Sequence, residues 1–461
     1  MILKKAEKLL ILVILCLCGY LIYDVYQPQA HNDKNKWGDT LILSGQADFI
    51  QEEIPLSETE KRVDQIREEQ LPSAYDGRNA GRAPRVKDQL NLGTCWAMTT
   101  SSALEAALLP EERRNFSPDH ISMQNGYAKS QKDGGAYTMA MAYLASWTGP
   151  VLEKQDPYGD GVSPTDLSPV KHVQEMQMFM GKEFEQMKRA IYEYGAVQAS
   201  IYMDMQGNQS TSVYYKEETN AYCYTGQEEP NHDVLLIGWD DDYPAENFSS
   251  GVKEDGAFIC QNSWGTSFGE QGVFYISYED VHIGENCVAY TRIDAADNYE
   301  KIYQTDLCGW VGQVGYDSET CWFANVYRTG EKAELVKAVA FYATGPNTEY
   351  EIWGVSAFTG TGSLKEAQII QAGSFENAGY YTVDLKNSME ISKEQDFAIL
   401  VKIKTPGEPY PVATEYQADE NTKFVDISDG TGYISLDGRR WTNTEETYQC
   451  NLCLKVFTDS K

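Results

Sequence analysis

The sequence is poor in positive charge. Of its 461 residues 38 are Lys or Arg, whereas 69 are Asp or Glu, and the formal net charge is -31. Binding to a nucleic-acid backbone needs clustered Lys and Arg, so this composition argues against nucleic acid as a partner. With 42% hydrophobic and 23% charged residues, the chain is still typical of a globular protein. Its length allows two or three domains.

Residue patterns that hold metals are also missing. The chain has five histidines, and three of them, His120, His172 and His282, lie in no cluster with the spacing of metal ligands. Cys450 and Cys453 form a Cys-x-x-Cys pair, but no second pair and no His-x-x-x-His accompanies it. We therefore predict no metal and no organic cofactor.

Long apolar runs are absent apart from one near the N-terminus. A basic head, residues 1–8, precedes an uncharged and largely apolar run, residues 9–23. This run is short for a membrane-spanning helix, which needs about 20 residues, and no small-residue cleavage site follows it. Two interpretations stay open for residues 1–26, an uncleaved membrane anchor and a cleaved secretory signal. Both predict that the rest of the chain lies outside the cytoplasm, at the cell membrane or secreted.

Cysteine is less scarce, with ten in the chain and two of them inside the apolar run. Cys95 is assigned to catalysis below, which leaves seven that can form disulfides in an exported protein. Cys308 with Cys321, and Cys450 with Cys453, are the pairs closest in sequence. The sequence leaves their connectivity open.

The rest of the chain divides into three parts by texture. Residues 27–70 are polar and acidic, which is typical of a stalk, a short pro-segment or a plain solvated linker. Residues 71–297 contain helical patterns first and strand patterns afterwards, which predicts an α+β domain with two segregated halves. The predicted helices cover residues 95–109, 136–147 and 182–194, and the predicted strands residues 196–202, 234–239, 256–261 and 272–277.

Beyond residue 298 the strand patterns continue without helices. Short runs rich in Val, Ile and Tyr alternate with turns that contain Gly and Asn, as in residues 334–342, 379–383 and 397–403. This spacing predicts an all-β sandwich over residues 298–461.

Three short motifs carry the chemistry. Cys95 opens a predicted helix, where free backbone N–H groups and the helix dipole favour a thiolate. His232 heads an apolar strand and can take the thiol proton, and Asn262 can orient the other ring nitrogen. Trp264 can shield that Asn–His bond from water. Gln89, six residues before Cys95, can donate a side-chain N–H to an oxyanion together with the backbone N–H of Cys95.

These motifs resemble those of papain-like cysteine peptidases. That family has Cys-Gly-Ser/Ala-Cys-Trp/Tyr around its nucleophile and a His about 130–150 residues downstream. This chain has Leu-Gly-Thr-Cys-Trp over residues 92–96 and a His 137 residues after Cys95. Leu92 replaces the cysteine that the family usually pairs in a disulfide. The resemblance covers about residues 71–293 and implies a two-lobed domain, with a helical left lobe and a β-barrel-like right lobe.

The same resemblance implies how substrate is held. Gly134 and Gly135 follow Asp133, where papain-like enzymes line their cleft with glycines, and they would bind an extended substrate backbone. A helix-entry turn is the plainer explanation of these glycines. Asp233 would border the pocket for the second substrate residue upstream of the cut, where a carboxylate favours basic side chains.

The C-terminal part is similar to the lectin-like domain that follows papain-like domains in a bacterial surface subgroup. Gly309-Trp310, residues 322–327 and residues 432–438 with Trp441 carry this resemblance. It leaves a cell-surface or carbohydrate ligand open, because a fold label does not establish binding. Packing in the core explains Trp310, Trp322, Trp353 and Trp441 better than stacking on sugars does.

The sequence therefore predicts an extracytoplasmic cysteine endopeptidase that hydrolyses polypeptides through a Cys95 acyl-enzyme. One alternative is a surface adhesin that uses the papain-like domain as a scaffold. The complete set of Cys95, His232, Asn262 and Gln89 argues against it. The other alternative is an acyl transferase with the same catalytic residues.

Overall fold

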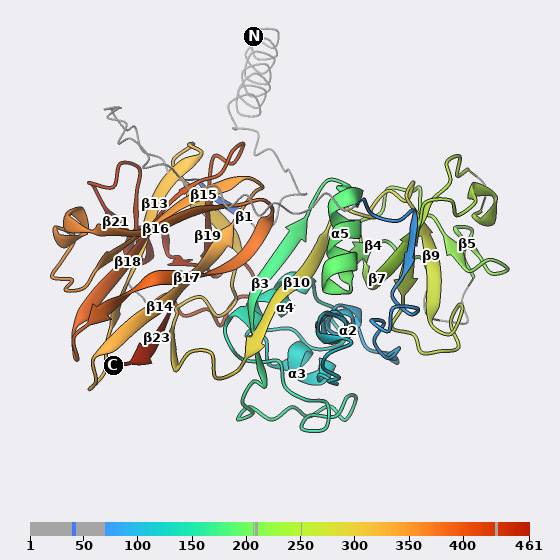
Figure 1. Cartoon of the computed structure of the whole chain (residues 1–461), viewed down its shortest axis with the longest axis horizontal. Coiled ribbons are helices and arrows are strands. Elements are labelled where there is room, and N and C mark those ends of the chain that lie inside the picture. Colours follow the sequence, from blue (N-terminus) through green and yellow to red (C-terminus); the bar gives the residue numbers. More distant parts are fainter. Residues whose placement is uncertain (1–38, 43–69, 206, 208–210, 250, 429–431) are drawn as a thin grey trace, which may run out of the picture. The chain divides into compact units, whose positions relative to one another are not determined.

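The computed structural model describes residues 39–42, 70–205, 207, 211–249, 251–428 and 432–461 (Figure 1). The apolar run 9–23, with its predicted role as anchor or signal, lies outside these residues, as does most of the segment 27–70. Among the helices of the described residues, none combines the length and apolar character needed to cross a membrane.

Helices of the first domain gather around its most buried helix, α2 (Cys95–Leu108), in which Trp96 through Ala106 are all buried. Small side chains allow this close packing against α3 (Pro118–Met123), α4 (Tyr137–Ala145) and three strands. A further helix, α5 (Phe184–Tyr194), covers the sheet and ends at Gly195, whose φ of 91° suits a residue without a Cβ. The predictions for α2, α4 and α5 are confirmed to within two residues at each end.

The strands of the first domain form one run of paired strands, antiparallel except where β6 pairs in parallel with β9, and residues of α5 belong to the hydrophobic core packed on it. The four predicted strands are confirmed as β4 (Val197–Ile201), β7 (His232–Asp240), β8 (Ala257–Gln261) and β9 (Val273–Ser277). The prediction missed β3 (Lys171–Phe179) and β10 (Cys287–Ala295), which pair with each other. Both strands mix charged and apolar side chains, so neither has a clear strand pattern in the sequence. They are recognised as strands by their pairing in the structure. Short strands complete the run: β2 (Ala74–Asp76), β5 (Tyr215–Lys216) and β6 (Ala221–Tyr222).

The second domain is a β sandwich, as predicted. Its core lies between two sheets and includes Phe341 of one and Ile399 of the other, both fully buried. One sheet has β11 (Lys301–Tyr303), β23 (Leu454–Ser460), β14 (Glu334–Ala343) and β17 (Ala378–Ile391). The other has β16 (Gln368–Phe375), β15 (Thr348–Val355), β18 (Asp396–Lys404), β13 (Thr320–Arg328), β20 (Gly432–Ser435) and β21 (Thr442–Asn443), followed by α6 (Thr444–Tyr448).

A third, four-stranded sheet contains a strand from the N-terminal segment. It joins β12 (Gly312–Gly315), β19 (Val412–Glu415) and β22 (Asn451–Leu452) to β1 (Asp39–Ile42). The backbone of β1 pairs in parallel with β12. One piece of the predicted stalk or pro-segment is thus part of the second domain.

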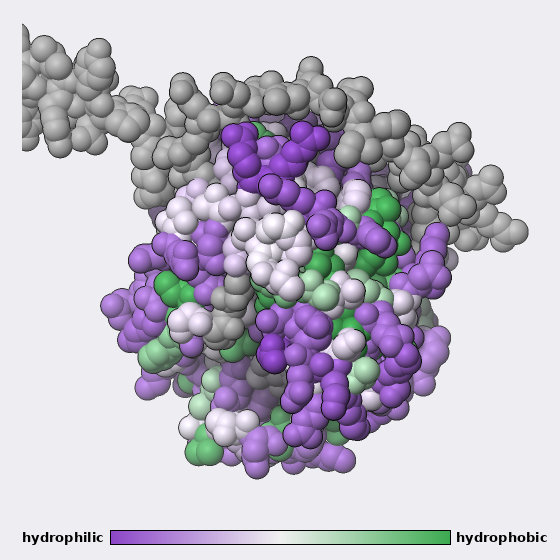
Figure 2. All heavy atoms as spheres, turned by 90° about the vertical axis from the view of Figure 1, so that its left-hand side faces the viewer, coloured by the Kyte–Doolittle hydropathy of each residue, from purple (hydrophilic) through white to green (hydrophobic). Residues whose placement is uncertain are grey.

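The four tryptophans of the second domain are all at least partly buried. Trp310 is buried, which confirms the packing interpretation for this residue, and the other three are partly buried. Trp322 and Trp353 lie against each other, with ring centroids 5.5 Å apart. Hydrophilic side chains cover most of the face in Figure 2, and the hydrophobic areas on it are small and scattered.

The two domains share a sheet, which the sequence did not predict. Strand β17 of the second domain pairs with β3 of the first, with Ala378 opposite Met178 and Tyr381 opposite Glu175 (Figure 1). A 13-stranded sheet therefore runs through both domains. Side chains reinforce the junction: Thr382 Oγ1 donates to Gln174 Oε1 at 2.6 Å. Arg292 also forms an ion pair with Asp384 at 2.9 Å.

Candidate active site

Cys95 is the first residue of α2, as the sequence predicted. No side chain caps this helix: the N-cap residue Thr94 makes no side-chain cap bond. The first N–H groups of α2 therefore stay free for a negative charge at the helix start. Cys95 is partly exposed, whereas the other seven cysteines of the described residues are buried, and all eight are unpaired. Exposure at a helix N-terminus singles out Cys95 as the candidate nucleophile.

His232 and Asn262 are brought together by the pairing of β7 with β8. His232 is the first residue of β7, Asn262 directly follows β8, and Leu235 pairs with Gln261. The imidazole Nε2 and Asn262 Oδ1 are 2.8 Å apart. Because Asn262 Oδ1 also accepts the N–H of Ser263 at 2.8 Å, it is the acceptor and Nε2 carries the hydrogen. In the neutral ring Nδ1 is then free to take a proton.

Trp264 covers this pair. Its ring centroid lies 5.1 Å from that of His232 with the planes 38° apart, and both side chains are buried. Phe268 packs edge-on against the indole, with ring centroids 5.0 Å apart. The arrangement excludes water from the His232–Asn262 bond, which strengthens it.

The helix with Cys95 and the strand with His232 pack directly on each other. Thr99 Oγ1 of α2 donates to the carbonyl oxygen of Asp233 at 3.2 Å. The backbone N–H of Asp233 also lies beside the Cys95 sulfur and stabilises its thiolate form. The nucleophile thus faces the strand end that carries the imidazole.

The surroundings of Cys95 disfavour its thiolate, and those of His232 disfavour its imidazolium. Burial raises the pKa of the Cys95 thiol to about 12, and the charge of Asp233 adds to this rise. Burial lowers the pKa of His232 to about 4, against the effect of its bond to Asn262. Moving the proton from Cys95 to His232 creates both charges at once, so that their attraction offsets the loss of solvation. Each group therefore depends on the other to become charged.

Gln89 is held with one hydrogen left to donate. Its Nε2 donates one hydrogen to the carbonyl of Leu92 at 2.8 Å, and its Oε1 accepts from Ser263 Oγ at 2.7 Å. The backbone N–H of Gln89 donates to Ser263 O at 2.8 Å, and that of Gly265 to Lys87 O at 3.0 Å. The second Nε2 hydrogen remains free for a substrate oxygen, and the loop around Gln89 is tied to the Asn-Ser-Trp-Gly motif.

The two predicted cleft glycines have different surroundings. Gly134 has a φ of 75°, and nothing lies within 4 Å of where its Cβ would be. A Cβ at Gly135 would lie 2.3 Å from Trp96 Cε2, and one at Gly93 would lie 2.8 Å from the backbone nitrogen of Gly134. The glycines thus let this segment lie directly against the residues around Cys95, with open space above Gly134.

Asp233 does not offer a free carboxylate to substrate, which contradicts the predicted role. Its side chain is 5% exposed. One carboxylate oxygen accepts from Gln198 Nε2 and the other from Ser200 Oγ, each at 2.7 Å. The prediction failed because it placed Asp233 from its neighbour in sequence, whereas successive side chains of a strand point to opposite faces.

A buried ion pair, which the sequence did not predict, lies behind the site. Lys87 Nζ lies 2.8 Å from Glu105 Oε1, and both side chains are 5% exposed. Glu105 also accepts the backbone N–H of Phe116 at 3.0 Å. The pair fastens the loop that carries Gln89 to the middle of α2. The signal in the sequence was Glu105, a single carboxylate in a helix of otherwise small and apolar residues.

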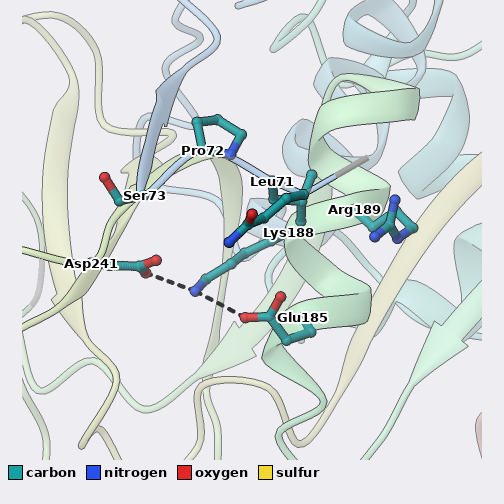
Figure 3. A pocket seen from close by; sticks show the side chains of 8 residues that line it. Leu71, Pro72, Ser73, Glu185, Lys188, Arg189 and Asp241 are labelled. Atoms are coloured by element: carbon teal, nitrogen blue, oxygen red, sulfur yellow. Dashed lines mark hydrogen bonds and ion pairs between the residues drawn. The ribbon is translucent and has the colours of Figure 1, made fainter. Parts of the chain in front are cut away.

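A cavity of about 590 Å³ shares no residue with this site. Leu71, Pro72 and Ser73 line it together with side chains of α5 (Figure 3). Lys188 Nζ lies 2.7 Å from Asp241 Oδ1 and 3.5 Å from Glu185 Oε1, so its charge is already paired. We assign no catalytic chemistry to this cavity.

Models of two known families match the two parts of the chain. A model of the papain family of cysteine proteases matches residues 71–293, and a model of the lectin-like domain matches residues 302–458. Cysteine proteinase 15A of Pisum sativum is 28% identical over 224 residues, which are 45% of this chain and 58% of the relative. Cathepsin K of Gallus gallus is 29% identical over 266 residues, 53% of this chain and 74% of the relative. The chain spans 65% of a cathepsin L-like peptidase of Aedes aegypti and 57% of a viral cathepsin, so that it covers less than two thirds of the length of several relatives.

Two solved structures of Cwp84 match both parts together. The clostridial cysteine protease Cwp84 after propeptide cleavage superposes with a TM-score of 0.73 at 25% identity, over 85% of this chain and 100% of that one. The protease and lectin-like domains of Cwp84, a surface layer associated protein of Clostridium difficile, give a TM-score of 0.72 at 23% identity, over 95% and 96%. This chain and the two Cwp84 structures share the fold and the order of the two domains.

Proposed function

Because residues 71–293 form a papain-family peptidase domain and residues 302–458 a lectin-like domain, we propose that this protein is a cysteine endopeptidase acting on polypeptides outside the cytoplasm. The observation that carries the proposal is the 2.8 Å contact between His232 Nε2 and Asn262 Oδ1 on the strand beside Cys95. This contact occupies Nε2 of His232, and it supports a role for Nδ1 as the nitrogen that takes the proton of the Cys95 thiol.

In the proposed reaction Cys95 gives its proton to His232 and attacks the peptide carbonyl carbon. The carbonyl oxygen becomes an oxyanion that accepts hydrogen bonds from Gln89 Nε2 and the backbone N–H of Cys95. As the C–N bond breaks, the imidazolium returns the proton to the leaving amine. Water then attacks the thioester, with His232 as base, and the carboxylic acid product and the Cys95 thiol are released.

We further propose that Gly134 and Gly135 bind the substrate backbone. The open space above Gly134 supports this role. Residues 27–70 would act as a pro-segment or stalk, and residues 1–26 as a membrane anchor or secretory signal that places the domains outside the cytoplasm. The basic head and apolar run of the sequence support export.

The test is covalent labelling of the full chain. An irreversible epoxide inhibitor of cysteine peptidases should label Cys95, as located by mass spectrometry, and should stop cleavage of an unstructured protein substrate. Cys95→Ala should abolish both label and cleavage. Cys223→Ala, which changes a buried cysteine outside the site, should leave both intact.

Two results would contradict the proposal. Cleavage that persists in Cys95→Ala would exclude Cys95 as the nucleophile. Transfer of the acyl group to an added amine, in preference to hydrolysis, would identify an acyl transferase.

A further inference from the structure

Asp233 is a buried carboxylate beside the candidate nucleophile. It accepts two hydrogen bonds, from Gln198 and Ser200, and is 5% exposed. No Lys or Arg of the described residues forms an ion pair with it. Burial of an acid without a cation is costly, and groups kept in such surroundings concentrate at functional sites.

Gln198 connects this carboxylate to the helix that begins at Cys95. Its Nε2 also donates to the carbonyl of Trp96 at 3.1 Å. Its Oε1 accepts from Thr100 Oγ1 at 2.9 Å and from Tyr290 OH at 3.0 Å. Asp233 therefore follows His232 on β7 while its carboxylate is hydrogen-bonded, through Gln198, to the first turns of α2.

The titratable groups around Asp233 come from each element packed on it. They are Cys95 of α2, Tyr137 of α4, Cys287 and Tyr290 of β10, and His232 on its own strand. All except protonated His232 are neutral or anionic. The charge of Asp233 raises the pKa of the Cys95 thiol, so the ionised carboxylate disfavours the thiolate.

We propose that Asp233 is a positioning residue whose charge controls the nucleophile: ionised Asp233 opposes the Cys95 thiolate, and protonated Asp233 permits it. Cys95 as nucleophile rests on the proposed function. Burial raises the pKa of Asp233 to about 6. The carboxylate is therefore neutral below about pH 5 and charged above about pH 7, which makes the thiolate relatively more favourable on acidification.

The experiment measures alkylation of Cys95 by iodoacetamide between pH 4.5 and 8, with mass spectrometry of the Cys95 peptide. The variant Asp233→Asn keeps the shape of the side chain. Its amide oxygen can accept from Gln198 Nε2, and the Ser200 hydroxyl can rotate to accept a hydrogen bond from the new amide NH2. The ratio of the variant's rate to that of the wild type should be about 1 at pH 5. It should rise roughly threefold to tenfold above pH 7, which corresponds to about half to one unit of pKa.

A second variant shifts the titration without removing the charge. Ser200→Ala deletes a hydrogen bond that lowers the pKa of Asp233, so the step in the wild-type profile should move to higher pH. Asp242→Asn is the matched control, because it removes one exposed charge just beyond the same strand, and its profile should equal that of the wild type.

A ratio for Asp233→Asn that stays constant with pH, as for a structural role, would overturn the proposal. If that variant does not fold by circular dichroism, an unmoved step in Ser200→Ala overturns it instead. Alkylation needs no peptide cleavage. Loss of the proposed function therefore appears as absent Cys95-dependent cleavage, whereas loss of this inference appears only in the alkylation profile.

Discussion

Gln89 uses the two ends of its amide for different partners. Oε1 accepts from Ser263, and Nε2 donates one of its two hydrogens to Leu92. The side chain is buried and cannot swing away. Its second hydrogen is thus held in place before substrate arrives, which is the condition under which a donor stabilises an oxyanion most.

We expect Gln89→Ala to lower kcat by about 100-fold to 1000-fold with little change in KM, because the lost bond forms in the transition state. Steady-state kinetics on a peptide substrate checks this. Ser263→Ala removes only the hydroxyl that donates to Gln89 Oε1 and keeps the bond of Gln89 Nε2 to Leu92, so a much smaller loss of kcat is expected. Equal losses in the two variants would assign Gln89 to support of the loop and not to the oxyanion.

At the scale of elements, the site depends on a loop fastened to a helix. Lys87 and Glu105 join the loop that carries Gln89 to α2, which begins at Cys95. Burial lowers the pKa of Lys87, and the charge of Glu105 acts against this. The pair ties the loop of Gln89 to the helix that begins at Cys95.

Lys87→Met should lower the free energy of unfolding by about 3–5 kcal/mol, because it leaves the Glu105 carboxylate buried without a cation. Denaturant unfolding measures this loss. The double variant Lys87→Met/Glu105→Gln should recover most of it, since the Gln carbonyl still accepts the N–H of Phe116. A double variant as unstable as the single one would show that packing, and not the unpaired charge, causes the loss.

At the scale of the whole molecule, the sheet shared by β3 and β17 couples the two domains. Backbone pairing, the Thr382–Gln174 hydrogen bond and the Arg292–Asp384 ion pair all cross the same boundary. Breaking it would expose an unpaired strand edge on each side. We therefore expect both domains to unfold together.

Pulsed thiol labelling during heating tests this expectation. Cys260 and Cys287 report on the first domain, and Cys321 and Cys450 on the second, because all four are buried. All four should become reactive at one temperature. Thr382→Val should lower that temperature for both domains through loss of about 1 kcal/mol, and Thr382→Ser should not. Separate transitions would show that the domains are independent.

Local chemistry explains what could be predicted. The helix that begins at Cys95, the apolar strand after His232 and the strand before Asn262 are each visible in a few consecutive residues, because helix and strand patterns depend on near neighbours. The structure brings His232 against Asn262 and Trp264, hydrogen-bonds Gln89 to Ser263, and places Cys95 beside the backbone of Asp233. The alternating patterns beyond residue 298 likewise predicted the sandwich.

The sequence by itself determined the two fold classes and the order of the candidate catalytic residues along the chain, since these follow from local patterns. Only the tertiary structure decided that Asp233 turns inward to Gln198 and Ser200, that Lys87 meets Glu105, and that β17 joins β3. These contacts link residues that are 18 to 206 positions apart: Lys87 and Glu105 are the closest in sequence, and Tyr381 and Glu175 are the farthest apart. Burial and strand pairing select such partners in three dimensions, and no local pattern encodes them.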